Sequence, residues 1–100
     1  YCENDNMCFG VMQALDERGI AYGDGGVTLI SFDAGRTALS YCKDGKIDLC
    51  AECNPLHGPR VRALIEQLAR GETPEKLSYM PEALFTADTL TAELLESRGY

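Results

Sequence analysis

The chain has 100 residues, of which 45% are hydrophobic and 25% are charged, and this is enough for one modest layered domain. Its formal net charge of −7, with only nine Lys and Arg, argues against a surface that binds nucleic acid or an anionic membrane. A neutral or cationic small molecule, or a protein, is the expected partner. No apolar run approaches the roughly 18 residues that a membrane-spanning helix needs.

The five cysteines are many for a chain of this length, and their number is odd. They cannot all pair with one another, so at least one thiol is free or bonds to something outside the chain. Because scattered thiols of cytosolic proteins usually stay reduced, this abundance favours an oxidising compartment.

The first third of the chain is predicted to contain a helix and a strand. Asn4 or Asp5 can cap the start of the helix, and Gly19 ends it. The apolar stripe of this helix consists of Met7, Val11, Ala14 and Leu15. A glycine-rich loop then leads into residues 27–32, a continuous apolar run typical of a buried parallel strand. This strand ends at Asp33.

A short helix and a second strand follow. Residues 37–44 suit a helix that closes at Gly45. Residues 47–53 suit a strand, which stops at Asn54 because Pro55 cannot donate to a sheet ladder.

The remaining residues predict two helices with an edge strand between them. The helix that opens at Pro59 and ends at Gly71 has the strongest amphipathic pattern. Its apolar positions are Val61, Leu64, Ile65 and Leu68. Residues 76–80 suit an edge strand, and a last helix is expected from residue 86 or 87 to Gly99. The alternation predicts an α/β fold, a three-layer parallel sheet with flanking helices and right-handed crossovers.

Two polar side chains come directly after predicted strands. Asn4 follows residues 1–3, which have the pattern of a strand end, and Asp33 follows the strand at 27–32. Carboxyl ends of parallel strands share one edge of a sheet, and open α/β sheets bind ligands there. An amide and a carboxylate at this edge could bind hydroxyl groups. The more ordinary local roles are a helix cap for Asn4 and a turn residue for Asp33.

Cys50, Cys53 and His57 could form half of a zinc site or a redox pair. A structural zinc site needs four ligands, however, and a thioredoxin-like pair belongs at a helix start. The spacing of the two cysteines places their thiols on opposite faces of a strand. No Gly-x-Ser-x-Gly, Walker or Gly-x-Gly-x-x-Gly motif occurs. The sequence therefore argues against an enzyme, a metal site and a cofactor.

Four short segments together carry a resemblance to a known family. They are Asn-Asp-x-Met-x-x-Gly at residues 4–10, Phe-Asp at 32–33, Asp-Gly-Lys-Ile at 44–47 and Glu-Cys-Asn-Pro-x-x-Gly-Pro at 52–59. In this order they resemble the C-terminal part of type I periplasmic sugar-binding proteins, the solute receptors of ABC importers. The last segment and the closing Arg-Gly-Tyr are most similar to the galactofuranose-binding branch.

The resemblance implies a receptor whose two lobes close on a monosaccharide such as galactofuranose and deliver it to the transporter permease. Residues 1–53 would belong to the C-terminal lobe. Residues 54–100 would form the crossover segment that returns to the N-terminal lobe, followed by the C-terminal tail. The chain would be about a third of such a receptor.

The same resemblance assigns the sugar contacts. Two of them would come from Asn4 and Asp33. The family commonly has a Gln where this chain has Cys53, so Cys53 or the adjacent Asn54 would have to take over the third contact.

Compartment and assembly follow as further expectations. A receptor of this kind is periplasmic or otherwise extracytoplasmic, and in a Gram-positive cell it would be a membrane-anchored lipoprotein. A piece that spans both lobes would expose apolar surfaces, so self-association or domain swapping is expected. The alternative is the effector-sensing domain of a LacI-type transcriptional regulator, which shares the fold. A thiol-redox or flavodoxin-like enzyme domain is a third possibility, which would require reactive Cys50 and Cys53.

Overall fold

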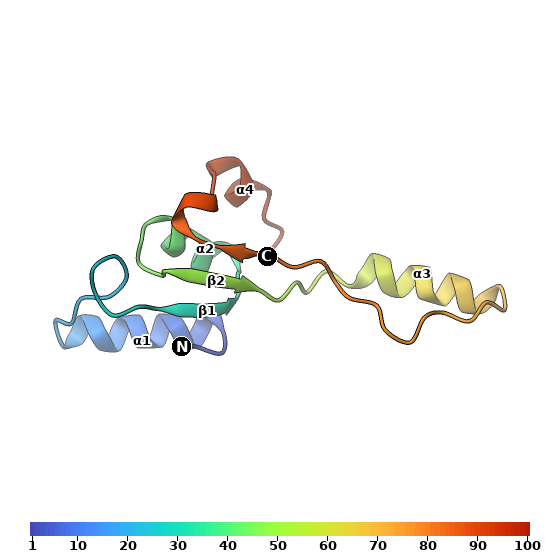
Figure 1. Cartoon of the computed structure of the whole chain (residues 1–100), viewed down its shortest axis with the longest axis horizontal. Helices are drawn as coiled ribbons and strands as arrows, with labels where there is room; N and C mark the ends of the chain where they lie inside the picture. The colour runs from blue at the N-terminus through green and yellow to red at the C-terminus, as the bar shows by residue number, and fades with distance from the viewer.

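A sheet of three strands in the order β1-β2-β3 forms the centre of the molecule in the computed structural model, which describes residues 1–100 (Figure 1). β1 (Ile30–Asp33) and β2 (Leu49–Glu52) are parallel, and β3 (Leu84–Phe85) is antiparallel to β2. The register places Asp33 beside Glu52, so β1 and β2 end together at one edge of the sheet.

Helices α1 (Asp5–Glu17) and α2 (Arg36–Lys43) cover the same face of this sheet. Ser31 of β1 and Cys50 of β2 are neighbours in the register and therefore point to one face. The Ser31 hydroxyl donates a hydrogen bond to the first residue of α1, and the Cys50 thiol lies 3.8 Å from the Ala38 carbonyl oxygen of α2. Both helices thus rest on this side of the strands.

The opposite face of the sheet is open. Leu84 is 65% exposed, whereas its neighbour Phe85, which points to the covered face, is 7% exposed. The Tyr1 ring lies edge-on against Phe32 on the open side, with 5.6 Å between the ring centroids. The predicted α/β alternation and the parallel β1–β2 pair are confirmed. The second helical layer of the predicted three-layer arrangement is not supplied by these residues.

The core lies between the covered face of the sheet and the helices, and it contains four of the five cysteines. Its buried residues are Cys2, Cys8, Met12, Leu29, Ala34, Ala38, Leu39, Cys42, Ile47, Cys50, Phe85 and Leu90. All five thiols are free. No helix of the chain is both long and apolar enough to cross a bilayer.

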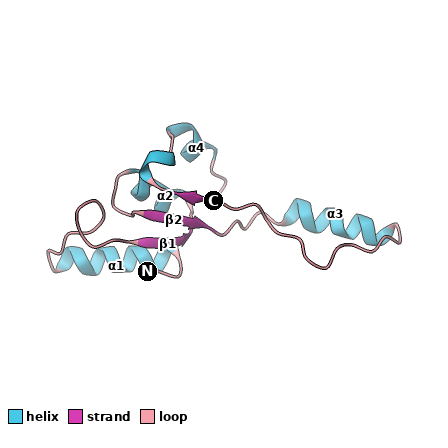
Figure 2. Cartoon of the chain, viewed as in Figure 1, coloured by secondary structure: helices cyan, strands magenta, loops and turns pink.

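Helix α3 (Gly58–Ala69) projects from the body as an arm, joined to it by two loop segments that run side by side (Figure 2). The chain therefore measures 60 × 26 × 16 Å. None of the α3 residues is buried, although this helix has the predicted bounds and amphipathic pattern. Val61, Ile65 and Leu68 are 50%, 60% and 61% exposed. The apolar face of α3 is therefore exposed, and no other part of this chain packs against it.

The capped helix predicted after Asn4 is confirmed as α1, but its inward face differs from the predicted stripe. Cys8 and Met12 are buried, whereas Met7 and Val11 are 53% and 39% exposed. The sulfur-containing side chains of Cys8 and Met12 fill the core here.

The edge strand predicted at residues 76–80 is wrong, and the third strand is β3 instead. The guanidinium of Arg60 donates to the Tyr79 carbonyl oxygen at 2.7 Å and also bonds the Ser78 hydroxyl, so this segment is tied to α3. The chain re-enters the body at the carboxyl end of β2, and for this reason β3 runs antiparallel in a sheet that was predicted to be parallel.

The last predicted helix is divided in two. A 3₁₀ turn at Ala87–Thr89 comes first, and α4 (Ala92–Ser97) begins only after Thr91, whose hydroxyl accepts a hydrogen bond from the Leu94 N–H at 3.1 Å. Both pieces pack beside α2. The segment from Leu84 onward therefore belongs physically to the same body as α1 and α2.

Candidate functional site

The carboxyl edge of β1 and β2 faces the arm (Figure 1), and Asp33 lies on this edge beside Glu52. Asn4 ends a segment that lies beside β1, since the Cys2 N–H donates to the Ile30 carbonyl oxygen at 2.8 Å. The Asn4 side chain accepts a hydrogen bond from the Met7 N–H at 2.9 Å. Asn4 is therefore the helix cap of α1, and its amide NH₂ group makes no hydrogen bond within the chain.

Asp33 is the last residue of β1, and its exposed carboxylate makes no hydrogen bond within the chain. Its backbone lies at φ +94°, and that of Ala34 at φ +57°. These are the only two residues other than glycine with a positive φ in this structure. Two consecutive positions of this kind are costly, and such strain persists where the surroundings impose it.

The turn at Asp33 and Ala34 is held by Asp5, which is 8% exposed. One Asp5 oxygen accepts a hydrogen bond from the Ser31 hydroxyl at 2.6 Å, and the other accepts one from the Gly35 N–H at 2.8 Å. The Asp5 carboxylate therefore joins the backbone that follows the turn to the strand that precedes it. A Cβ added at Gly35 would come within 3.2 Å of this carboxylate, so the glycine allows the close approach.

A second polar cluster on the same edge is formed by Glu52 and the C-terminal residues. Arg98 and Glu52 form an ion pair at 2.9 Å, with side chains only 11% and 7% exposed. The Tyr100 hydroxyl donates to the same Glu52 oxygen at 2.6 Å, and the Tyr100 ring stacks on the Arg98 guanidinium at 4.3 Å. Arg98 Nε in turn donates to the Ala34 carbonyl oxygen at 3.0 Å.

The electrostatics of this cluster follow from burial and pairing. Burial pushes the pKa of Glu52 upward, but the hydrogen bond from Tyr100 and the charge of Arg98 outweigh it, so the pKa is lowered overall. Burial and the hydrogen bond to Glu52 raise the pKa of Tyr100 to about 12. Glu52 is thus held as a carboxylate and Tyr100 as a neutral donor.

Cys53 and Asn54 continue from β2 beyond this edge. The Cys53 thiol is exposed, and its N–H donates to the Asp33 carbonyl oxygen at 3.3 Å, so the two residues are neighbours. The Asn54 side chain accepts a hydrogen bond from the Leu56 N–H at 2.9 Å and forms a local turn. Of the two predicted substitutes for the missing Gln, Cys53 is the one that lies beside Asp33 with a free side chain.

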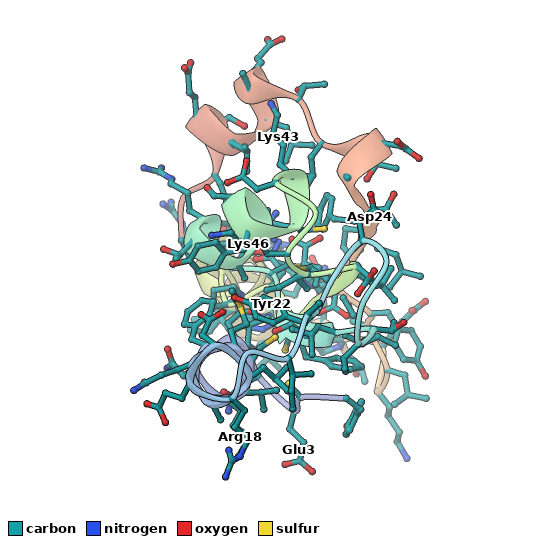
Figure 3. The ribbon with its side chains drawn as sticks, turned by 90° about the vertical axis from the view of Figure 1, so that its left-hand side faces the viewer. Glu3, Arg18, Tyr22, Asp24, Lys43 and Lys46 are labelled. Atoms are coloured by element: carbon teal, nitrogen blue, oxygen red, sulfur yellow. The ribbon has the colours of Figure 1, made fainter.

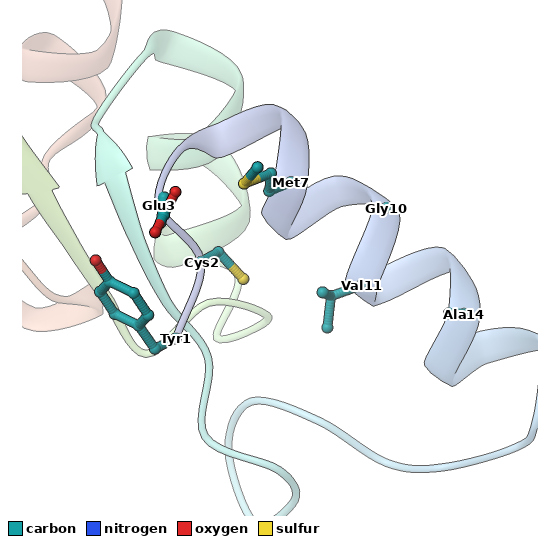
Figure 4. A pocket seen from close by; sticks show the side chains of 7 residues that line it. All are labelled: Tyr1, Cys2, Glu3, Met7, Gly10, Val11 and Ala14. Atoms are coloured by element: carbon teal, nitrogen blue, oxygen red, sulfur yellow. The ribbon is translucent and has the colours of Figure 1, made fainter.

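A polar hollow of about 290 Å³ lies at this edge, with Asp33, Asn6, Arg36 and Tyr100 in its lining. A larger hollow of about 650 Å³ lies between the first residues and the outer flank of α1, where Cys2, Met7 and Val11 line it (Figure 4). The larger hollow is mostly apolar and contains none of the predicted ligand contacts. The smaller one has polar groups of the kind that bind hydroxylated ligands, and of the four predicted contacts only Asp33 lines it.

The end of the body opposite the arm carries a different set of side chains. Figure 3 shows Arg18, Tyr22, Asp24 and Lys46 at this end. Tyr22 donates to Asp16 at 3.2 Å. These residues lie at the amino ends of the strands, away from Asp33.

The thiols do not form a reactive pair. Cys50 is fully buried and Cys53 is exposed, as the strand spacing predicts. Burial raises the pKa of Cys50 far above its usual range and also raises that of Cys42, which leaves little thiolate. No group of three or more His, Cys, Asp or Glu side chains is placed to hold a metal ion.

Sequence reasoning missed the supporting residues of the site. The sequence predicts Asp5 only as a helix cap, although a carboxylate directly after Asn4 and before an apolar helix is also a signal of a buried acceptor. Arg98 and Tyr100 belong to the closing Arg-Gly-Tyr segment, which suggested the galactofuranose-binding branch. Arg98 and Tyr100 contact Glu52, from which they are separated by 46 and 48 positions in the sequence, respectively.

Two proteins of known function are similar to this chain in sequence. The galactofuranose-binding protein YtfQ of Escherichia coli (strain K12) is 33% identical over 100 residues, which is 99% of this chain and 31% of that protein. The fructose import binding protein FruE of Bifidobacterium longum (strain NCC 2705) is 32% identical over 76 residues, which is 76% of this chain and 22% of that protein. No protein-family model matches the chain.

A solved structure gives the same result for the fold. The periplasmic binding protein component of the arabinose ABC transporter from Shewanella sp. ANA-3, bound to alpha and beta-L-arabinofuranose, matches with a TM-score of 0.82 and 26% identity. The match covers 97% of this chain and 32% of that chain. The fold is therefore that of part of a type I periplasmic binding protein. Within that class the chain belongs with the sugar-binding solute receptors of ABC importers, and it spans less than a third of the length of the two curated relatives.

Proposed function

We propose that this chain is part of the substrate-binding component of an ABC-type sugar importer, which binds a monosaccharide between two lobes and delivers it to the permease. The relatives that support this are named for binding galactofuranose and for importing fructose, and a structural neighbour holds arabinofuranose. Because two of these sugars are furanoses, a five-membered sugar ring such as galactofuranose is the proposed ligand. The component would act outside the cytoplasm, like the periplasmic binding protein from Shewanella sp. ANA-3, and would bind rather than convert the sugar.

The observation that carries this proposal is the pair of unused polar groups on one sheet edge. The Asp33 carboxylate and the Asn4 amide NH₂ have no hydrogen-bond partner within the chain. A carboxylate accepts and an amide NH₂ donates, so together they match the alternating donors and acceptors of sugar hydroxyls. Cys53, beside Asp33, is the proposed third contact, and Asn54 contributes by shaping the turn that follows.

The two-lobe arrangement is proposed from the shape of the chain. The sheet body, residues 1–53 with the returning tail, would belong to the C-terminal lobe, and α3 would pack into the N-terminal lobe. The exposed apolar face of α3 supports this placement. The two loop segments between this body and α3 would contain the hinge between the lobes.

The experiment that tests the function is calorimetric titration of the whole receptor that contains this chain. Galactofuranose, arabinofuranose and fructose would be compared with their pyranose counterparts. We expect micromolar or tighter binding of at least one furanose. Absence of binding to all of them, in a folded receptor, would contradict the proposal. The LacI-type alternative has less support, because the named relatives are binding proteins rather than regulators.

A further inference from the structure

We propose that Asp5 and Arg98 are positioning residues that hold the strained turn at Asp33 and Ala34, and thereby present the Asp33 carboxylate to the sugar. This inference rests on the proposed function of Asp33 as a ligand contact. It adds two residues that act on Asp33 through the backbone of the turn.

The turn needs external support because its backbone is unfavourable for its sequence. Asp33 at φ +94° lies outside the range that even Asp adopts with ease, and Ala34 at φ +57° has a Cβ that crowds the following carbonyl group. A free segment of this sequence would relax to negative φ. The Asp33 side chain would then point in a different direction from the sheet edge.

Each of the three residues after Asp33 has a backbone group bonded to a different anchor. The Ala34 carbonyl oxygen accepts from Arg98 Nε at 3.0 Å. The Gly35 N–H donates to Asp5 at 2.8 Å. The Arg36 N–H donates to the Tyr100 carbonyl oxygen at 2.7 Å. Because none of these bonds involves the Asp33 side chain, they fix the backbone and leave the carboxylate available.

Asp5 and Arg98 are themselves held by other contacts. Asp5 is 8% exposed, and its other oxygen is bonded to Ser31, which is fully buried. The Arg98 side chain is 11% exposed and is paired with Glu52. Because both side chains are nearly buried and each has a further polar partner, we infer that they keep the shape of the turn before the sugar binds. Preorganisation of this kind raises affinity by removing an ordering cost on binding.

The test is a set of variants of the whole receptor, measured for sugar affinity by calorimetry and for stability by urea denaturation. In Asp5→Asn the amide oxygen can still accept from the Gly35 N–H and the NH₂ can donate to the Ser31 hydroxyl, but both bonds lose the charge that strengthens them. We expect affinity to fall at least fivefold in the folded receptor. Asp24→Asn, at an exposed carboxylate in the distant glycine-rich loop, is the matched control and should leave affinity unchanged.

A double-mutant cycle separates positioning from general destabilisation. If Asp5 acts through Asp33, then Asp5→Asn should cost much less affinity in an Asp33→Asn background than in the native one. Equal, additive losses in the two backgrounds would overturn the inference. Loss of affinity in Asp33→Asn, with native affinity in Asp5→Asn, would also overturn it while leaving the proposed function intact.

Ala34→Gly provides the second line of evidence, and it relieves the turn if Asp5→Asn by itself fails to fold. Glycine adopts positive φ without strain, so this variant removes the strain that Asp5 and Arg98 are proposed to oppose. We expect Asp5→Asn to cost at least threefold less affinity in the Ala34→Gly background than in the native one. An equal cost in the two backgrounds would contradict the inference. If Asp33→Asn itself bound sugar with native affinity, the proposed function of Asp33 would fail first.

Discussion

Glu52 and Glu82 each accept a hydrogen bond from the backbone of the segment that carries the other. Glu52 Oε2 accepts from the Ala83 N–H at 3.0 Å, and Glu82 Oε1 accepts from the Asn54 N–H at 3.0 Å. Between them the Glu52 N–H donates to the Ala83 carbonyl oxygen at 2.9 Å. The two loop segments that lead to α3 are therefore braced against each other at their base, and any bending must occur beyond Asn54.

Glu52→Gln is expected to lower the free energy of unfolding by about 3 kcal/mol. The substitution leaves the Arg98 charge almost buried without a counter-charge, and breaking a buried ion pair in this way costs roughly 3–5 kcal/mol. Urea denaturation measures the change. The control is Glu66→Gln, which breaks the exposed pair with Arg62 and should cost about 1 kcal/mol or less. Equal losses in the two variants would refute the buried role of Glu52.

The acid sensitivity of the fold should depend on Glu52. Its pKa is lowered in the folded chain, so its stabilising contribution is present above the ordinary Glu pKa and is lost as the pH falls through the folded value. We expect the stability difference between the native chain and Glu52→Gln to be full near neutral pH and to shrink below about pH 4.5. Unfolding free energies measured across this range test the direction. A difference that grows on acidification would contradict it.

Asp33→Ala is expected to weaken sugar binding by the whole receptor more than about tenfold. A hydrogen bond to a charged group contributes roughly 1.5–3 kcal/mol, and the carboxylate has no other partner in the chain. Calorimetric titration gives the affinity. An unchanged value would remove Asp33 from the site.

Cys53 should be the one cysteine that reacts with maleimide in the folded, reduced protein. The other four thiols are buried, and burial raises the pKa of Cys8 to about 12. For the 100-residue chain, mass spectrometry should find one adduct in the native state and five after denaturation. In the whole receptor, bound sugar should slow the modification of Cys53 if Cys53 borders the ligand. Equal rates with and without sugar would place Cys53 outside the site.

The 100-residue chain expressed by itself should associate with further copies. The apolar face of α3 and the open face of the sheet are both exposed. Size-exclusion chromatography with light scattering measures the mass. Replacing Ile65 and Leu68 with Gln should shift the chain toward the monomer, whereas replacing the exposed polar Arg62 and Glu66 with Gln should not. A monomeric native chain would contradict the prediction.

The sequence predicted those features that depend on local pattern. The bounds of α2 and α3 follow from glycine stops and from the proline at the start of α3. The parallel pairing of β1 with β2 follows from a continuous apolar run and an intervening helix. The position of Asp33 at the end of β1 could be predicted from the point where that apolar run stops.

Features that depend on distant partners could not be predicted in this way. β3 has only two residues, and its direction is set by the return of the chain from the arm. The segment at 76–80 has strand-like residues, but the Arg60 side chain occupies its polar groups instead. The strained turn at Ala34 carries no glycine signal, because its conformation is imposed by Asp5 and Arg98 from opposite ends of the chain.

The late return of β3 has a consequence for how the chain matures during synthesis. Phe85 and Leu90 complete the core against residues that were translated more than thirty positions earlier, such as Cys50 and Cys42. Until Phe85 and Leu90 have emerged from the ribosome, α1 and α2 can pack only on β1 and β2, without the side chains that β3 and the tail add to the core. The thiols of Cys42 and Cys50, which are buried in the finished fold, are accessible to oxidants during that interval.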